Sequence, residues 1–150
     1  MITTTDVVQK KSFTQIYRER GYFFREAAML TIALGFGLHL FRVIFGDAMT
    51  LQYAVTPLTD VILLFPMTYA ATAGIIGRRR MVFVNRPHMV AITAAIGYIT
   101  LSVPLHLYVL LVMKDVSFYV SMAGTWLSYL LICLVYPMFL AILWRLRYKD

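Results

Sequence analysis

The chain has 150 residues, of which 61% are hydrophobic and 14% charged, and its formal net charge is +7. A soluble domain is about half apolar and about a quarter charged, so this composition excludes an ordinary soluble domain and predicts one integral membrane domain over residues 1–150. No polar stretch is long enough for a separate catalytic domain, which favours a non-catalytic subunit over a stand-alone enzyme.

The chain begins with a polar and basic segment, residues 1–26. Within it, Phe13, Ile16 and Tyr17 would share one face of a short helix, with Arg18 and Glu19 off that face. Such a helix lies along a membrane surface with its apolar face in the headgroup region. We therefore expect an interfacial segment on the cytoplasmic side before the first membrane span.

Four apolar runs follow, and each can supply the roughly 20 helical residues that cross a bilayer. We expect the spans at residues 27–45, 57–77, 88–113 and 118–144. The runs are continuous and lack the alternation of barrel strands, so they predict helices. Thr56 is expected to cap the second helix, with Pro57 in its first turn. The predicted fold is an all-α membrane protein, a four-helix transmembrane bundle of two tandem helical hairpins.

The basic residues predict the orientation of this bundle. Twelve of the 14 Lys and Arg residues fall in the N-terminal segment, the second connection and the C-terminal segment, which share one side of a four-span chain. The positive-inside rule places that side, and both termini, in the cytoplasm, as in a bacterial inner membrane protein. In the second connection, Arg78, Arg79 and Arg80 are expected to contact anionic lipid headgroups, and we expect no nucleic-acid partner.

The two hairpins resemble each other in sequence. When the chain is shifted by 67 residues, residues 27–41 fall on residues 94–108 with seven identities in fifteen positions, and His39 falls on His106. With one further residue Asp47 meets Asp115, and later "FPM" meets "YPM". A duplicated hairpin would give two halves related by an axis along the membrane normal. The two histidines should then lie at one depth, about 10 Å below the outer edge at 1.5 Å per residue.

The paired histidines predict a binding site. Neutral imidazole binds haem iron axially, so two helices across an axis could hold one b-haem between His39 and His106. Gly35 and Ser102 each precede a histidine by one turn and would leave room for a flat ligand. The alternative is two structural histidines that bond to neighbouring helices. Zinc or copper is less well supported, because two histidines need further ligands and no cysteine lies near.

Two more charged residues fall within the predicted spans. Asp60 lies in the first turn of the second helix, where a carboxylate suits the helix dipole, and Arg42 lies near the outer end of the first. A structural ion pair between Arg42 and Asp60 is the simplest expectation. With haem bound, Arg42 could instead face a propionate, and in a transporter Asp60 could carry a proton.

Three functions therefore stay open at this stage. The sharpest is an electron-transfer or anchor subunit of a membrane complex that holds b-haem. The second is a small transporter or a flippase component for a lipid-linked substrate, with Asp60 and the histidines as polar lining. The third is a structural or assembly subunit without chemistry of its own. Each implies the lipid bilayer as surroundings, and other membrane subunits or further copies of the chain as partners.

Overall fold

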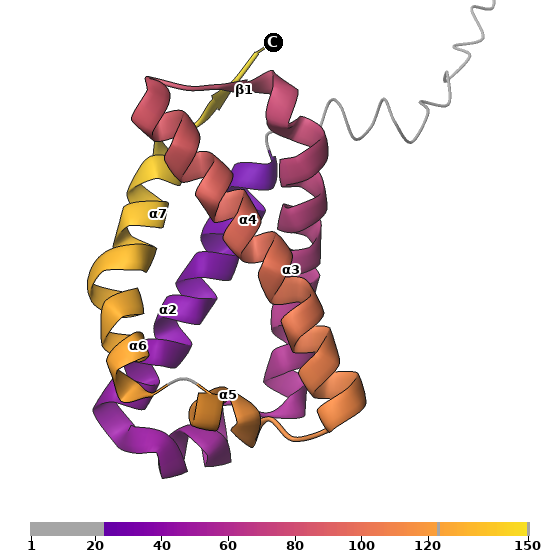
Figure 1. Cartoon of the computed structure of the whole chain (residues 1–150), viewed down its shortest axis with the longest axis vertical. Helices are drawn as coiled ribbons and strands as arrows, with labels where there is room; N and C mark the ends of the chain where they lie inside the picture. The colour runs from indigo at the N-terminus through magenta and orange to yellow at the C-terminus, as the bar shows by residue number, and fades with distance from the viewer. Residues whose placement is uncertain (1–22, 123, 150) are drawn as a thin grey trace, which may run out of the picture.

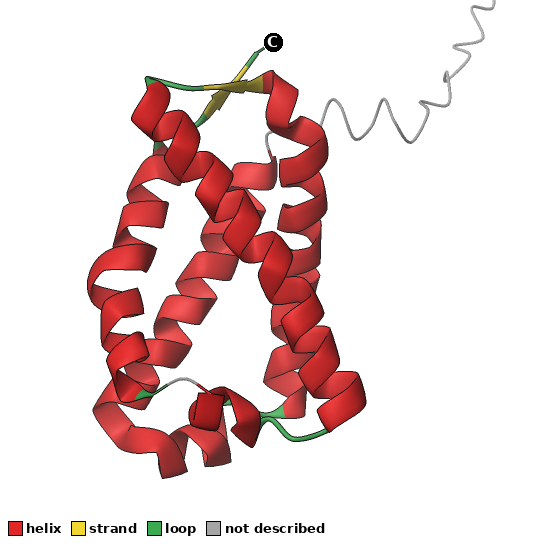
Figure 2. Cartoon of the chain, viewed as in Figure 1, coloured by secondary structure: helices red, strands yellow, loops and turns green. Residues whose placement is uncertain are grey.

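The computed structural model describes residues 23–122 and 124–149, and these residues form a helical bundle closed at one end by a small strand pair (Figures 1 and 2). The predicted interfacial segment lies almost wholly outside the described residues. In chain order the elements are α2 (Phe23–Met49), α3 (Pro57–Gly77), β1 (Met81–Val82), α4 (Arg86–Tyr108), α5 (Ser117–Met122), α6 (Thr125–Leu130), α7 (Tyr136–Trp144) and β2 (Arg147–Tyr148). Short π-helical segments follow or join several helices, at Thr50–Ala54, Val109–Met113 and Leu131–Val135.

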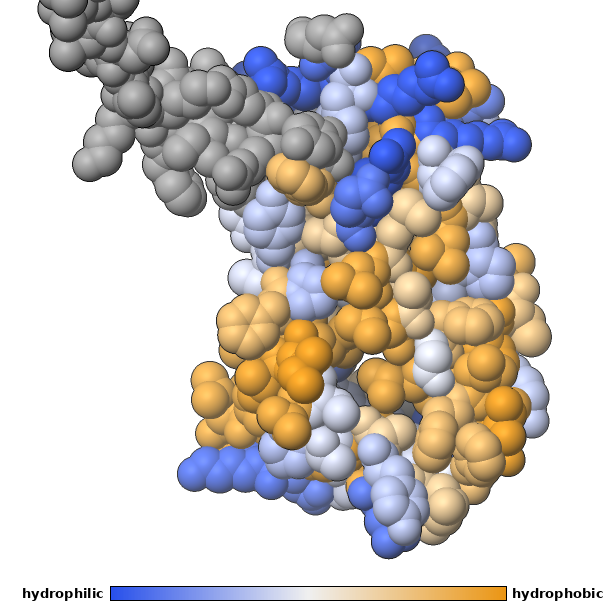
Figure 3. Space-filling model, turned by 180° about the vertical axis from the view of Figure 1, so that it is seen from behind, coloured by the Kyte–Doolittle hydropathy of each residue, from blue (hydrophilic) through white to orange (hydrophobic). Residues whose placement is uncertain are grey.

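Within residues 23–122 and 124–149, four helical segments are long and apolar enough to cross a membrane, which agrees with an integral membrane bundle. They are Phe23–Ala54, Pro57–Arg80, Arg86–Met113 and Thr125–Trp144. In Figure 3 hydrophilic residues gather at both ends of the molecule and hydrophobic ones dominate the band between them. This distribution is the one that a bilayer requires of a protein that spans it.

The start of the second span agrees with its prediction. Thr56 caps α3: the Thr59 N–H donates to Thr56 Oγ1 over 3.2 Å, and the Thr56 N–H donates to Thr59 Oγ1 over 2.8 Å. Pro57 follows in the first turn, where a missing N–H leaves no helical bond unmade.

The fourth span begins later than predicted, at Thr125 instead of residue 118. The apolar run conceals a break: Gly124 takes φ −53° and ψ 158°, which is not helical. The residues before it form the separate short helix α5, which lies at the end of the bundle opposite the strand pair (Figure 1). Hydropathy counts apolar residues and does not register a single backbone turn of this kind.

The first helix also changes direction near its end. Gly46 has φ 81° and ψ 174°, a conformation that glycine adopts far more readily than other residues. The chain bends at Gly46, and the helical segment continues beyond the predicted end at residue 45, as far as Ala54.

The end of the bundle that carries the strand pair, here named the closed end, is tightly packed. Phe24 and Ala28 of α2, Ile92 and Ala95 of α4 and Leu143 of α7 are fully buried there. A side chain at Gly74 would meet the Phe24 ring at 2.8 Å, so α3 approaches its neighbours too closely for anything larger than glycine. Small residues permit such close helix contacts within membranes.

The strand pair joins the two hairpins at the closed end. β1 and β2 are antiparallel, with Met81 opposite Tyr148 and Val82 opposite Arg147, and the Lys149 N–H donates to the Arg80 carbonyl over 2.9 Å. His88 adds a further link, because its Nε2 lies 2.9 Å from the Ile142 carbonyl of α7.

Candidate functional site

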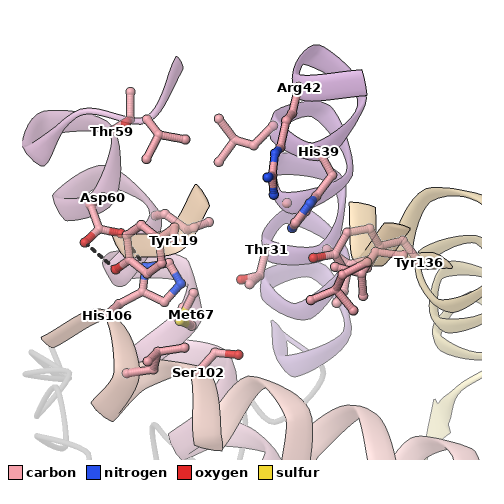
Figure 4. Close-up of a pocket in the computed structure, with 18 of the residues that line it drawn as sticks. Thr31, His39, Arg42, Thr59, Asp60, Met67, Ser102, His106, Tyr119 and Tyr136 are labelled. Carbon is pink, nitrogen blue, oxygen red and sulfur yellow. Dashed lines mark hydrogen bonds and ion pairs between the residues drawn. The ribbon is translucent and has the colours of Figure 1, made fainter. Parts of the chain in front are cut away.

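The opposite end of the bundle, here named the cavity end, contains a cavity of about 290 Å³. All four spans and α5 contribute to its walls, and Figure 3 shows a hollow in the half of the molecule away from the strand pair. Most of the lining is apolar. The polar lining residues are Thr31, His39, Arg42, Thr50, Thr59, Asp60, Tyr98, Ser102, His106, Tyr119 and Tyr136. In Figure 4 His39 and Arg42 face the cavity from α2, while Asp60, His106 and Tyr119 lie on the other side.

On one wall, Asp60 is the centre of a hydrogen-bonded cluster. It is only 5% exposed, His106 Nδ1 contacts its Oδ1, and the Tyr119 hydroxyl donates to its Oδ2 over 3.0 Å. The His106 and Tyr119 rings lie against each other, with centroids 4.9 Å apart. Burial and the adjacent carboxylate raise the pKa of Tyr119, which lies outside the four spans, so its hydroxyl stays protonated and donates.

On the other wall, His39 and Arg42 share a serine. His39 Nδ1 lies 2.9 Å from Ser128 Oγ, and Arg42 donates to the same oxygen over 3.5 Å. Arg42 is 5% exposed, and it also donates to Asp47 Oδ1 over 2.7 Å and to the Val120 carbonyl over 3.2 Å. The Arg42 guanidinium thus has a carboxylate, a carbonyl and a hydroxyl as partners.

The structure corrects the predicted ion pair between Arg42 and Asp60. Arg42 pairs with Asp47 and Asp60 contacts His106. In a regular helix, residues five apart point about 140° away from each other, so Asp47 was not an obvious partner for Arg42. The bend at Gly46 removes this restriction, because it redirects the chain immediately before Asp47.

The two small residues line the cavity, but the expected space beside Gly35 is occupied. A side chain at Gly35 would meet the Tyr136 hydroxyl at 3.1 Å, so Tyr136 takes the place that a flat ligand would have used. The Tyr136 hydroxyl is 2.9 Å from that of Tyr98. Ser102 donates to the Tyr98 carbonyl over 2.8 Å, which leaves its oxygen as an acceptor toward the cavity.

Both histidines engage Nδ1, and within the described residues no hydrogen-bond partner is recorded for either Nε2. Among residues 23–122 and 124–149, no group of three or more His, Cys, Asp or Glu side chains could hold a metal ion. A metal site built from protein ligands alone is thus not supported in this part of the chain.

The two walls are built in a reciprocal way. His39 of the first hairpin bonds to Ser128 of the second, and His106 of the second contacts Asp60 of the first. Asp60 is the fourth residue of α3 and Ser128 is the fourth residue of α6. Each histidine therefore meets the same position in the other hairpin, which is the arrangement expected of two related halves.

Sequence reasoning missed Ser128, Tyr119 and the two tyrosines Tyr98 and Tyr136. Ser128 had a usable signal, because a shift of 68 residues, which aligns Asp47 with Asp115, also aligns Asp60 with Ser128. Tyr119 had no such signal in the sequence, since its role depends on the break that separates α5 from α6.

Comparison of the chain with protein-family models, curated proteins and solved structures gives no match.

Proposed function

We propose that the chain is a small membrane transport component that binds its substrate in the cavity at the cavity end. The observation that carries this proposal is the buried Asp60 on the cavity wall, with His106 and Tyr119 on its two oxygens. Ionisable groups within membrane spans are costly to keep and typically line substrate or proton pathways. Apolar cavities with a few convergent polar groups are the usual form of small-molecule sites.

The cluster has the chemistry for exchanging a proton against a substrate. A carboxylate and an imidazole in contact can hold or release one proton between them, and chains of Asp and His serve as proton relays in transporters. Tyr119 stays protonated and donates to Asp60, so it stabilises the charged carboxylate after the proton leaves. Substrate binding and proton release would then occur at the same group.

The architecture supports this function in a second way. The cavity lies in the half of the bundle away from the strand pair, while the closed end has packed helices and the strand pair. Related halves that rock against each other around one site are a common solution to alternating access. In our proposal the basic closed end lies in the cytoplasm, with Arg78, Arg79 and Arg80 near anionic headgroups, and the cavity faces the other side.

Proton movement in proteoliposomes tests the proposal. The full chain is reconstituted with a trapped pH-sensitive dye, and small neutral solutes, organic acids and amines are added outside. We expect one class to drive proton movement, which Asp60→Asn abolishes. Asp115→Asn is the matched control, because it makes the same change at an exposed carboxylate outside the cavity. If no solute is taken up and no protons move, the proposal is wrong.

The b-haem hypothesis makes a contrary prediction about the same cavity. It has the free Nε2 atoms of His39 and His106 in its favour, while Tyr136 beside Gly35 restricts the space. A preparation from haem-replete cells with a reduced-minus-oxidised absorption band, lost in both His39→Ala and His106→Ala, would replace the transport proposal with an electron-transfer subunit. We expect a colourless protein.

A further inference from the structure

We infer that the cavity selects a small aromatic or aliphatic organic cation, an ammonium compound of about ten non-hydrogen atoms. This inference rests on the proposed function, since it names the substrate class of the same site. It follows from the charges around the cavity, from the aromatic rings in its walls and from its size.

The charges around the cavity depend on whether His106 holds a proton. Arg42 is the cation of the lining, and its charge is balanced by Asp47 at 2.7 Å. Asp60 contacts the His106 imidazole and the Tyr119 hydroxyl, and the imidazole balances its charge only when protonated. When neither histidine carries a proton, the cavity and the Arg42–Asp47 pair together carry one net negative charge, on Asp60.

A net negative charge in an apolar, partly enclosed space favours a cation strongly. The low local dielectric strengthens attraction between opposite charges, and an anion placed there would meet the Asp60 carboxylate without compensation. The proton that His106 can accept is one such cation. An organic ammonium group is the other, and the two would compete for the same carboxylate.

The remaining lining suits the apolar part of such a cation. Tyr98, Tyr119 and Tyr136 contribute aromatic rings, whose faces attract ammonium groups. The lining also includes aliphatic residues such as Ile32 and Met67. A cavity of about 290 Å³ exceeds the roughly 150 Å³ of an engineered apolar cavity that binds benzene, so a single substituted ring can fit.

Three probes of similar shape and different charge test the inference. Phenyltrimethylammonium is the cation, tert-butylbenzene its neutral carbon analogue and benzenesulfonate the anion. Binding to the purified full chain in nanodiscs is measured by equilibrium dialysis. We expect the cation to bind more tightly than either of the others. Asp60→Asn should weaken cation binding by about tenfold or more, as expected when one partner of a buried charge pair is removed.

Two controls keep the result interpretable. Asp115→Asn should bind the cation as the unmodified chain does, and Asp60→Glu should retain part of the affinity, because it restores the charge. A variant that fails to fold is recognised by its thermal unfolding, and the Asp60→Glu result then decides whether the charge matters.

Preference for the neutral or anionic probe, or equal cation binding in Asp60→Asn, would overturn the cation inference. The proposed function would survive that result, because the flux assay tests acids and neutral solutes as well. If no neutral solute, organic acid or amine drives flux in the unmodified chain, the proposed function itself is wrong, whatever the three probes show.

Discussion

The two histidine sites are built on the same plan and differ in charge. His39 meets Ser128, and His106 meets Asp60, at matching positions of the opposite hairpins. The first site has its charge balanced within the protein, since Arg42 is paired outside the cavity with Asp47. The second has a carboxylate whose partners are an imidazole and a tyrosine hydroxyl. In our inference this carboxylate is the group that attracts the ligand.

The comparison shows what the two hairpins provide in common and what Asp60 adds where the other hairpin has Ser128. The scaffold supplies a histidine on each side of the cavity and a hydrogen-bonding residue at the start of the opposing helix. A serine there completes a neutral contact, which costs little in a membrane. An aspartate there introduces a buried charge that is expensive unless it is used or compensated.

Making the two sites alike should have the largest effect. Asp60→Ser gives α3 the residue found at the fourth position of α6, and it removes the carboxylate from His106 and Tyr119. We expect loss of cation binding and of proton movement, with a loss of about 1–3 kcal/mol in the free energy of unfolding from the two orphaned partners. Dialysis and the flux assay measure the first two effects, and thermal unfolding the third.

The reciprocal exchange is the control for this prediction. In the double variant Asp60→Ser, Ser128→Asp the carboxylate returns, but beside Arg42 and His39. Arg42 would neutralise it, so cation binding should not recover. Recovery in the double variant would contradict the assignment of the negative charge to one wall.

Removing the cation of the balanced site should mainly affect stability. Arg42→Met breaks the contacts with Asp47, the Val120 carbonyl and Ser128. Because Asp47 is 49% exposed and can be hydrated, we expect a loss of about 3 kcal/mol in the free energy of unfolding, the low end for a broken buried pair. Thermal unfolding in detergent measures it. An unchanged midpoint would show that the guanidinium contacts contribute little.

Tyr119→Phe tests the charged site more gently. It removes one donor from the Asp60 carboxylate and leaves the ring against His106. A hydrogen bond to a charged group contributes about 1.5–3 kcal/mol. Cation affinity should therefore fall by about tenfold, and binding should stay measurable. Tyr129→Phe, which alters a tyrosine outside the cavity lining, is the matched control. Equal cation affinities in Tyr119→Phe and Tyr129→Phe would show that the Tyr119 hydroxyl does not contribute to the site.

The smallest effect is expected from Ser128→Ala. The substitution deletes the hydroxyl that hydrogen-bonds to His39 and accepts from Arg42, and it leaves the Arg42–Asp47 pair in place. A loss of about 1 kcal/mol in the free energy of unfolding is expected. Proton movement and cation binding should remain, as measured in the same assays. Their loss would mean that the wall with His39 and Arg42 also takes part in transport.

Much of the fold follows from hydropathy and capping. The four long apolar helices and the cap at Thr56 are set by local sequence, so the hydropathy and capping patterns predict them. Both histidines line one cavity, and the repeat had brought them together as a predicted pair.

The polar contacts were not accessible in the same way. The partner of Arg42 depends on the bend at Gly46, and the partner of Asp60 depends on how α4 and α5 lie against α3. Pairings of this kind are decided by three-dimensional packing of segments far apart in the chain. Periodicity and composition describe one segment at a time, so they predict which residues face inward and not which of them meet.

The strand pair at the closed end has a consequence for biosynthesis. β2 follows α7 in the chain, so its pairing with β1 can form only after all four helices have been synthesised. Until then the connection between α3 and α4 lacks both the Met81–Tyr148 pairing and the Lys149 bond to Arg80. Insertion of the helices and sealing of this end are therefore separate events, and an affinity tag fused after residue 150 would sit directly beside the last contact to form.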